Sequence, residues 1–149
     1  MNIKLNYIIN FQKATTSIYV FFLMYYYNNY NLTSYIYLSL HGTYGLLWIL
    51  KDNIFPDMNF HINISSLQAS FSIIFLGLYW ISPYLIIKNK IEASNFKIII
   101  SIISHTIGCV LMMSSDSQKY FVLQEKKKKN IDKNYRLISD GWFKKCRNP

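Results

Sequence analysis

Apolar residues gather in four long segments that are separated by short polar stretches. The segments comprise residues 11–27, 32–50, 67–87 and 96–113. Each approaches the roughly 20 residues that a helix needs to cross the hydrocarbon core of a bilayer. Because a backbone in lipid must satisfy its own hydrogen bonds, these segments are expected to be helical. The pattern therefore predicts an all-α integral membrane helical bundle with about four transmembrane helices, formed by residues 1–113.

The breaks between the segments contain residues that are typical of turns and helix ends. A polar turn at residues 28–31, Asn-Asn-Tyr-Asn, predicts that the first two segments form a helical hairpin. Pro56 is expected to end the second helix, because the residue before a proline avoids the helical region. Ser82 and Pro83 are expected to kink the third segment or to end it early.

The remaining residues, 114–149, form a polar and basic segment. The chain carries 16 Lys and Arg against 7 Asp and Glu, a formal net charge of +9, and ten of the basic residues lie at or after Lys119. Because the rest of the chain has the character of a membrane protein, this charge does not indicate nucleic-acid binding. The lysine run at residues 126–129 is instead expected to contact the anionic head groups of membrane lipids.

The placement of Lys and Arg predicts the orientation in the membrane. With the N-terminus in the cytosol, the inside segments hold Lys4, Lys13, Lys51 and the ten basic residues of the tail, 13 in all. The outside segments hold only three lysines, at positions 88, 90 and 97. Cytosolic segments carry the excess of Lys and Arg. Both termini are therefore expected in the cytosol, where the basic segment can meet soluble nucleotides.

Cysteine and histidine spacing gives no disulfide or metal signature. The chain has two cysteines, Cys109 and Cys146, and three scattered histidines, so no metal site is expected. His41 and His105 lie within apolar segments, where an ionisable side chain is a candidate functional group. For each of these two histidines, a packed and hydrogen-bonded role and a role in a pocket are both open.

A short polar element directly follows the fourth apolar segment, with the sequence Ser-Ser-Asp-Ser-Gln-Lys at residues 114–119. Ser115 or Asp116 could cap a new helix whose apolar residues lie at the membrane interface. The other interpretation is a ligand site. The Asp116 carboxylate could accept hydrogen bonds from a ribose, and Lys119 could meet a phosphate group.

The end of the chain holds two further elements. An Asp-Gly pair at residues 140–141 predicts a tight turn, and Trp142 and Phe143 are expected to dock onto the membrane or the bundle. The chain closes with the sequence Arg147-Asn148-Pro149. Arg can pair with phosphate through two parallel hydrogen bonds, and Asn can both donate and accept.

Three motifs together resemble those of the steroid 5α-reductase-like family, and more narrowly of a branch with a reductase-type C-terminal domain. They are HGTYGLLWILKDNIFPD at residues 41–57, SDSQKYFVL at residues 115–123 and LISDGWFKKCRNP at residues 137–149. The order and spacing of the last two make the match fairly specific. Before Ser39 the resemblance is one of hydropathy alone.

The resemblance implies a membrane fold of about seven spans, usually in the endoplasmic reticulum. It implies that NADPH binds from the cytosolic side and that hydride passes to the carbon–carbon double bond of an enone-type lipid or steroid-like substrate. Asp116 and Asn148 match residues that contribute to the family's cofactor site. Lys119, Arg136 and Arg147 are further candidate partners of the cofactor on grounds of charge.

The family continues beyond the Arg-Asn-Pro motif with helices that carry the catalytic Glu and more cofactor contacts. The chain is therefore expected to be a C-terminally truncated fragment or a degraded gene copy, and the reductase activity is expected of the full-length protein. Two other classes are open. One is a membrane methyltransferase for lipids or isoprenylcysteine, which would use S-adenosylmethionine and an Arg-His-Pro motif. The other is a non-enzymatic membrane protein.

Overall fold

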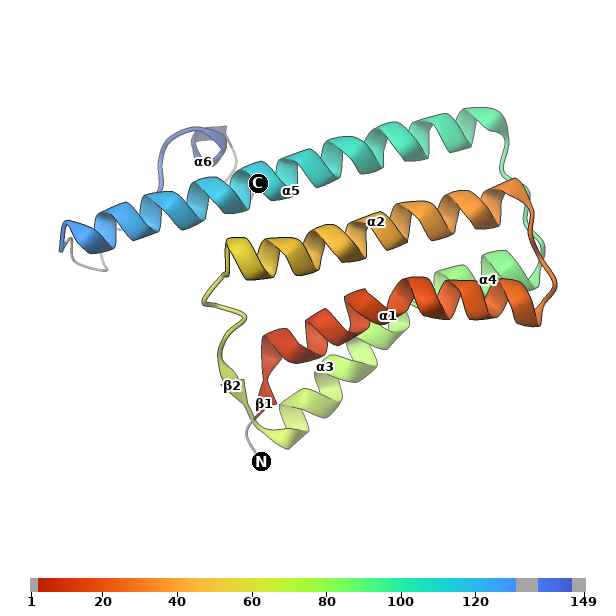
Figure 1. Ribbon diagram of the computed structural model, residues 1–149, viewed down its shortest axis with the longest axis horizontal. Coiled ribbons are helices and arrows are strands. Elements are labelled where there is room, and N and C mark those ends of the chain that lie inside the picture. The colour runs from red at the N-terminus through yellow and green to blue at the C-terminus, as the bar shows by residue number, and fades with distance from the viewer. Residues whose placement is uncertain (1–2, 131–136, 146–149) are drawn as a thin grey trace.

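The computed structural model describes residues 3–130 and 137–145 of the chain, and most of these residues lie in helices (Figure 1). Two short strands form one antiparallel pair, in which Ile3 lies opposite Ile64. The elements are β1 (Ile3–Lys4), α1 (Leu5–Tyr26), α2 (Leu32–Ile54), β2 (Asn63–Ile64), α3 (Ser66–Leu78), α4 (Ile81–Lys88), α5 (Asn95–Lys128) and α6 (Trp142–Lys145). The prediction of an all-α fold is confirmed.

The predicted hairpin is formed by α1 and α2, which lie side by side along their length (Figure 1). Asn31 begins α2, because its side chain accepts a hydrogen bond from the backbone N–H of Ser34 at 2.9 Å. The two helices approach each other closely at Gly45, where an added Cβ would lie 2.5 Å from the carbonyl oxygen of Lys13. Helix α2 ends at Ile54, just before Phe55 and Pro56, as predicted.

The third apolar segment is divided into α3 and α4, with the break at Tyr79 and Trp80. Pro83 is the third residue of α4, where its missing N–H costs no intrahelical hydrogen bond. The predicted interruption of the third segment is therefore confirmed, although the break lies a few residues before Pro83. Trp80 secures the break, because its indole Nε1 donates to Thr16 Oγ1 of α1 at 3.0 Å.

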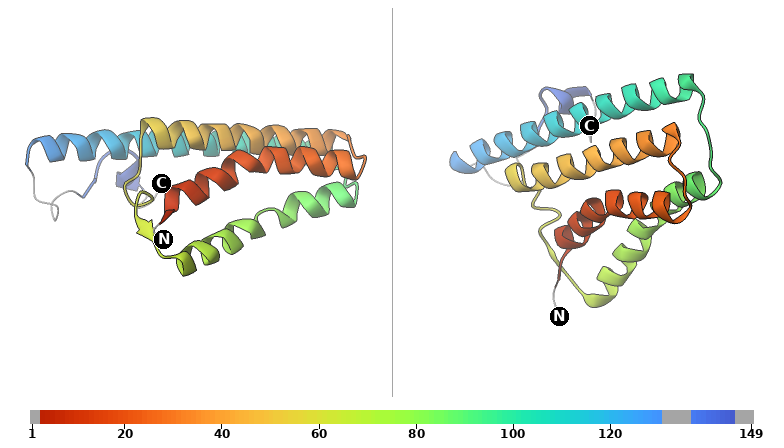
Figure 2. Two further views of the ribbon diagram at one scale, coloured as in Figure 1. Left: turned by 60° about the horizontal axis from the view of Figure 1, so that its bottom comes forward. Right: turned by 45° about the vertical axis from the view of Figure 1, so that its right-hand side comes forward.

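The helices are arranged as neighbours in the order α5, α2, α1, with α3 and α4 crossing α1 on its other side (Figure 2). A small core of Val20, Leu23, Met24 and Ile87 fills the space between α1 and α4. Helix α5 packs chiefly on α2. Most of its apolar side chains are exposed on the outside of the bundle.

One prediction about α5 is wrong: no new helix begins at Ser115 or Asp116. Helix α5 is continuous over 34 residues from Asn95 to Lys128. The serines do not interrupt it, because Ser114 Oγ donates to the Val110 carbonyl at 2.7 Å and Ser115 Oγ to the Met112 carbonyl at 3.3 Å. Such back-bonding lets a serine remain within a helix.

Within the described residues, two helical stretches are long and apolar enough to cross a membrane. They are Ser66–Lys88, which combines α3 and α4, and Asn95–Lys128, which is α5. Helices α1 and α2 have comparable lengths of 22 and 23 residues. However, α1 buries the polar side chains of Asn6, Gln12 and Thr16.

Candidate functional site

The candidate site lies where the C-terminal end of α2 and the segment after it face the second half of α5. Three stretches of chain that are distant in sequence meet there. These are residues 51–59, residues 115–127 and residues 137–142, and hydrogen bonds or ion pairs join the second stretch to each of the other two. The structure thus brings the described parts of the three sequence motifs together at one end of the bundle.

Asp116, the expected acceptor for a ribose, already forms an ion pair. Its Oδ2 lies 2.8 Å from Nζ of Lys51, and the Lys51 side chain is only 3% exposed. The ammonium group of Lys51 also lies over two aromatic rings, 4.2 Å from the centroid of Trp48 and 5.6 Å from that of Phe60. A buried cation requires such compensation. Asp116 therefore has a structural role whether or not it binds a ligand.

Lys119, the expected phosphate partner, forms the second ion pair of the site. Its Nζ donates to Asp57 Oδ2 at 2.5 Å, and Asp57 Oδ1 accepts from the backbone N–H of Asn59 at 3.0 Å. Burial by itself would raise the pKa of Asp57. The hydrogen bonds from Lys119 and Asn59 and the positive charge nearby outweigh burial, so the pKa lies below its ordinary value.

Behind these pairs lies a polar cluster around Asp52, which the sequence interpretation missed. The Asp52 carboxylate accepts from Asn6 Nδ2 at 3.2 Å and from Asn10 Nδ2 at 2.7 Å, and His61 Nε2 lies 3.0 Å from it. Trp48 donates its indole N–H to Asn10. The sequence feature that could have indicated this cluster is the pair Lys51-Asp52 at the end of an apolar segment. A carboxylate that is buried there needs hydrogen-bond partners. The cluster fixes the N-terminus of α1 and the segment before β2 to the end of α2.

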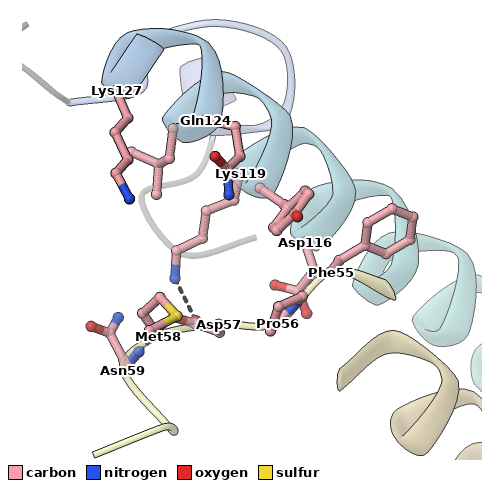
Figure 3. Close-up of a pocket in the computed structure, with 11 residues that line it drawn as sticks. Phe55, Pro56, Asp57, Met58, Asn59, Asp116, Lys119, Gln124 and Lys127 are labelled. Carbon is pink, nitrogen blue, oxygen red and sulfur yellow. Dashed lines mark hydrogen bonds and ion pairs between the residues drawn. The ribbon is translucent and has the colours of Figure 1, made fainter. Parts of the chain in front are cut away.

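A cleft opens between α5 and the segment that follows α2, with a volume of about 670 Å³ (Figure 3). Its lining is mostly apolar and includes charged side chains of both signs. The lining residues are Phe55, Pro56, Asp57, Met58, Asn59, Asp116, Lys119, Tyr120, Leu123, Gln124 and Lys127. The cleft thus combines an apolar surface with cations, which suits a ligand that has both an apolar or planar part and an anionic part.

One face of α5 supplies more than half of this lining. Asp116, Lys119, Leu123 and Lys127 follow one another at spacings of three and four residues, which places them on the same side of a helix. Lys127 differs from Lys119 in its partners. Within residues 3–130 and 137–145, the ammonium group of the Lys127 side chain makes no hydrogen bond or ion pair.

The predicted Asp-Gly turn is confirmed, and it docks onto α5 rather than elsewhere on the bundle. Gln118 Nε2 donates to the Asp140 carbonyl at 2.8 Å, and its Oε1 accepts from the Trp142 backbone N–H at 3.1 Å. Gly141 has a φ of +54°, a conformation that favours glycine. A further bond joins Lys126 Nζ to the Leu137 carbonyl at 2.6 Å.

The other predicted site residues lie elsewhere. Arg136, Arg147 and Asn148 fall outside the described residues. His41 is packed against Tyr37, with its ring stacked at 3.9 Å and its Nδ1 3.0 Å from the Tyr37 carbonyl oxygen. The ring nitrogens of His105 lie 3.6 and 3.8 Å from Cys109 Sγ. Among the described residues no group of His, Cys, Asp and Glu could hold a metal ion.

Comparisons with known proteins add no further evidence about this site. A scan against protein-family models matched none of them, and searches of curated proteins and of solved structures returned no match. The resemblance to the steroid 5α-reductase-like family stays a prediction from the three motifs.

Proposed function

We propose that this chain is the cofactor-holding part of a membrane-bound reductase that uses NADPH to reduce a carbon–carbon double bond in a lipid or steroid-like enone. The observation that carries the proposal is the cleft between α5 and residues 55–59. Two of the residues expected to bind the cofactor, Asp116 and Lys119, line this cleft together with a further cation, Lys127.

The proposal sets the bundle in a membrane with four spans and both termini in the cytosol. Helices α1 and α2 have 22 and 23 residues, which gives each a length of about 33 Å at 1.5 Å per residue. That length matches the roughly 30 Å hydrocarbon core of a bilayer. The cleft then lies at the cytosolic surface, in the endoplasmic reticulum by analogy with the family, where NADPH is available.

The donor set of the cleft fits an anionic dinucleotide. Lys119 can turn from Asp57 to a phosphate oxygen, which is also an anionic acceptor. Asp116 uses Oδ2 for Lys51, and within the described residues Oδ1 makes no hydrogen bond, so Oδ1 can accept from a ribose hydroxyl. Phe55, Tyr120 and Leu123 offer apolar surface to the planar rings of the ligand.

The cofactor would supply hydride to the alkene, and this chain's own residues would bind and orient it. The first half of α5 leads from the cleft into the apolar part of the bundle. A lipid substrate would therefore approach the reactive ring from the membrane side. The resemblance assigns the remaining catalytic residues to a region beyond residue 149.

Binding of NADPH to the 149-residue chain in lipid nanodiscs tests this proposal, with the fluorescence of the reduced nicotinamide as readout. We expect saturable binding, and we expect Lys119→Gln to weaken it by about tenfold because a charge-assisted hydrogen bond is lost. S-adenosylmethionine provides the comparison. Binding of that compound in preference to NADPH would indicate a methyltransferase, and binding of neither would refute the proposed cofactor site.

A further inference from the structure

We infer that Lys127 is the residue that selects NADPH over NADH, by binding the 2′-phosphate of the adenosine ribose. The inference rests on the proposed function and deepens it. NADPH and NADH differ only in this phosphate, so a residue that distinguishes them must present a cation to it and must lie apart from the pyrophosphate site.

The positions of the two lysines along α5 fit two separate anionic groups. Lys119 and Lys127 are eight residues apart on the same face of the helix, which separates their Cα atoms by about 12 Å along the axis. Leu123 and Gln124 lie between them, and Met58 faces this region from the other side of the cleft (Figure 3). The cleft therefore has two cations with an apolar and amide-bearing surface between them.

The partners of the lysines distinguish their roles. Lys119 is held by Asp57 at 2.5 Å, Lys126 by the Leu137 carbonyl at 2.6 Å and Lys129 by Glu125 at 2.6 Å. Lys127 points into the cleft without a partner among the described residues (Figure 3). An anion can bind Lys127 without displacing another group. Of the lysines at residues 126–129 only Lys127 lines the cleft, and its side chain has no partner within the described residues.

The order of the residues also gives the ligand a direction. Asp116 lies nearest to the apolar half of α5, Lys119 follows, and Lys127 lies nearest to the water-facing end. A dinucleotide that places its nicotinamide ribose at Asp116 and its pyrophosphate at Lys119 carries its adenosine toward Lys127. Its reactive ring then lies at the membrane side, where an apolar substrate would be. Met58, a flexible thioether, can adapt to the adenine ring.

Affinities for NADPH and NADH, measured with the full chain in nanodiscs of phosphatidylcholine, test the assignment. The variants are Lys127→Gln, Lys119→Gln and a matched control, Lys128→Gln, which removes the same charge one residue along α5 at a position that does not line the cleft. We expect Lys127→Gln to weaken NADPH binding by about tenfold and to leave NADH binding unchanged. We expect Lys119→Gln to weaken both and Lys128→Gln to change neither. Lys127→Arg should keep the preference for NADPH.

The possible failures are distinguishable. If the wild-type chain binds neither nucleotide, the proposed function is wrong and the role of Lys127 falls with it. If the chain binds both, and Lys127→Gln weakens both equally or neither, the proposed function stands and the assignment of Lys127 is wrong. If Lys127→Gln alters binding only in nanodiscs that contain anionic lipid, Lys127 contacts lipid head groups, and the assignment is again overturned.

Discussion

The ion pair between Lys51 and Asp116 allows a quantitative test of the fold around the cleft. Asp116→Asn keeps the size of the side chain and removes its charge. Lys51 then remains 3% exposed without a counter-charge. The aromatic rings of Trp48 and Phe60 stay beside it. The variant should therefore destabilise the packing of α5 on α2 and leave the helical content of each helix intact.

The size of the effect follows from the geometry. At 2.8 Å and an effective dielectric constant of about 20, the attraction between the two charges is about 6 kcal/mol before desolvation is subtracted. Removing one partner of a buried pair costs roughly 3–5 kcal/mol. The Asp116 side chain is 24% exposed, so water screens part of the attraction. The cation–π contact with Trp48 also remains, and it contributes about 1 kcal/mol. We therefore expect a loss of about 3 kcal/mol in the free energy of unfolding.

Unfolding in mixed micelles, followed by far-ultraviolet circular dichroism as sodium dodecyl sulfate is added, measures this loss. The double variant Lys51→Met with Asp116→Leu removes both charges and should lie within about 1.5 kcal/mol of wild type. Glu125→Gln breaks the exposed pair with Lys129 and should have little or no effect. The reasoning is refuted if Asp116→Asn is as stable as wild type, or if the double variant is as unstable as the single one.

Three further predictions use the same unfolding and binding assays. Gly45→Ala should cost about 1–3 kcal/mol, because its Cβ would lie 2.5 Å from the Lys13 carbonyl oxygen, whereas Gly108→Ala, with nothing within 4 Å, should be neutral or slightly stabilising. The pKa of Asp57 is lowered from 3.8, so its ion pair should stabilise the fold fully above pH 3.8. This contribution should disappear as the pH falls below 3.8 through the lower, folded-state value, and unfolding measured over that range should show no such loss in Asp57→Asn. Asp57→Asn should also tighten NADPH binding severalfold by releasing Lys119, and unchanged or weaker binding would contradict the competition between Asp57 and the ligand.

The sequence predicted those parts of the fold that depend on local chemistry. The polar turn at residues 28–31 predicted the α1–α2 hairpin, and the proline at position 56 predicted the end of α2. Both residue patterns affect the backbone only within a few residues of their own position. The Asp-Gly pair at residues 140–141 likewise gave a turn. These features need no knowledge of distant contacts.

The partners of the site residues could not be predicted in the same way. Asp116 and Lys119 were identified as candidates, but nothing in the spacing indicated that Lys51 and Asp57 would neutralise them across more than 60 residues of chain. The partners of Asp52 could not be predicted either, because Asn6 and Asn10 lie on another helix. Charge pairing over such separations depends on tertiary packing, which cannot be derived from the spacing of residues in a single sequence.

These partners decide which substitutions can report on ligand binding. Asp116→Ala would remove the counter-charge of the buried Lys51, so a loss of nucleotide affinity in that variant would follow from damaged packing as readily as from a lost contact. Lys119→Gln likewise breaks the pair with Asp57, whose side chain is only 14% exposed and keeps the hydrogen bond from the Asn59 N–H. Lys127 has no partner in the described part of the chain that could be disturbed. Substitutions at Lys127 therefore separate binding from stability, whereas those at Asp116 and Lys119 combine the two.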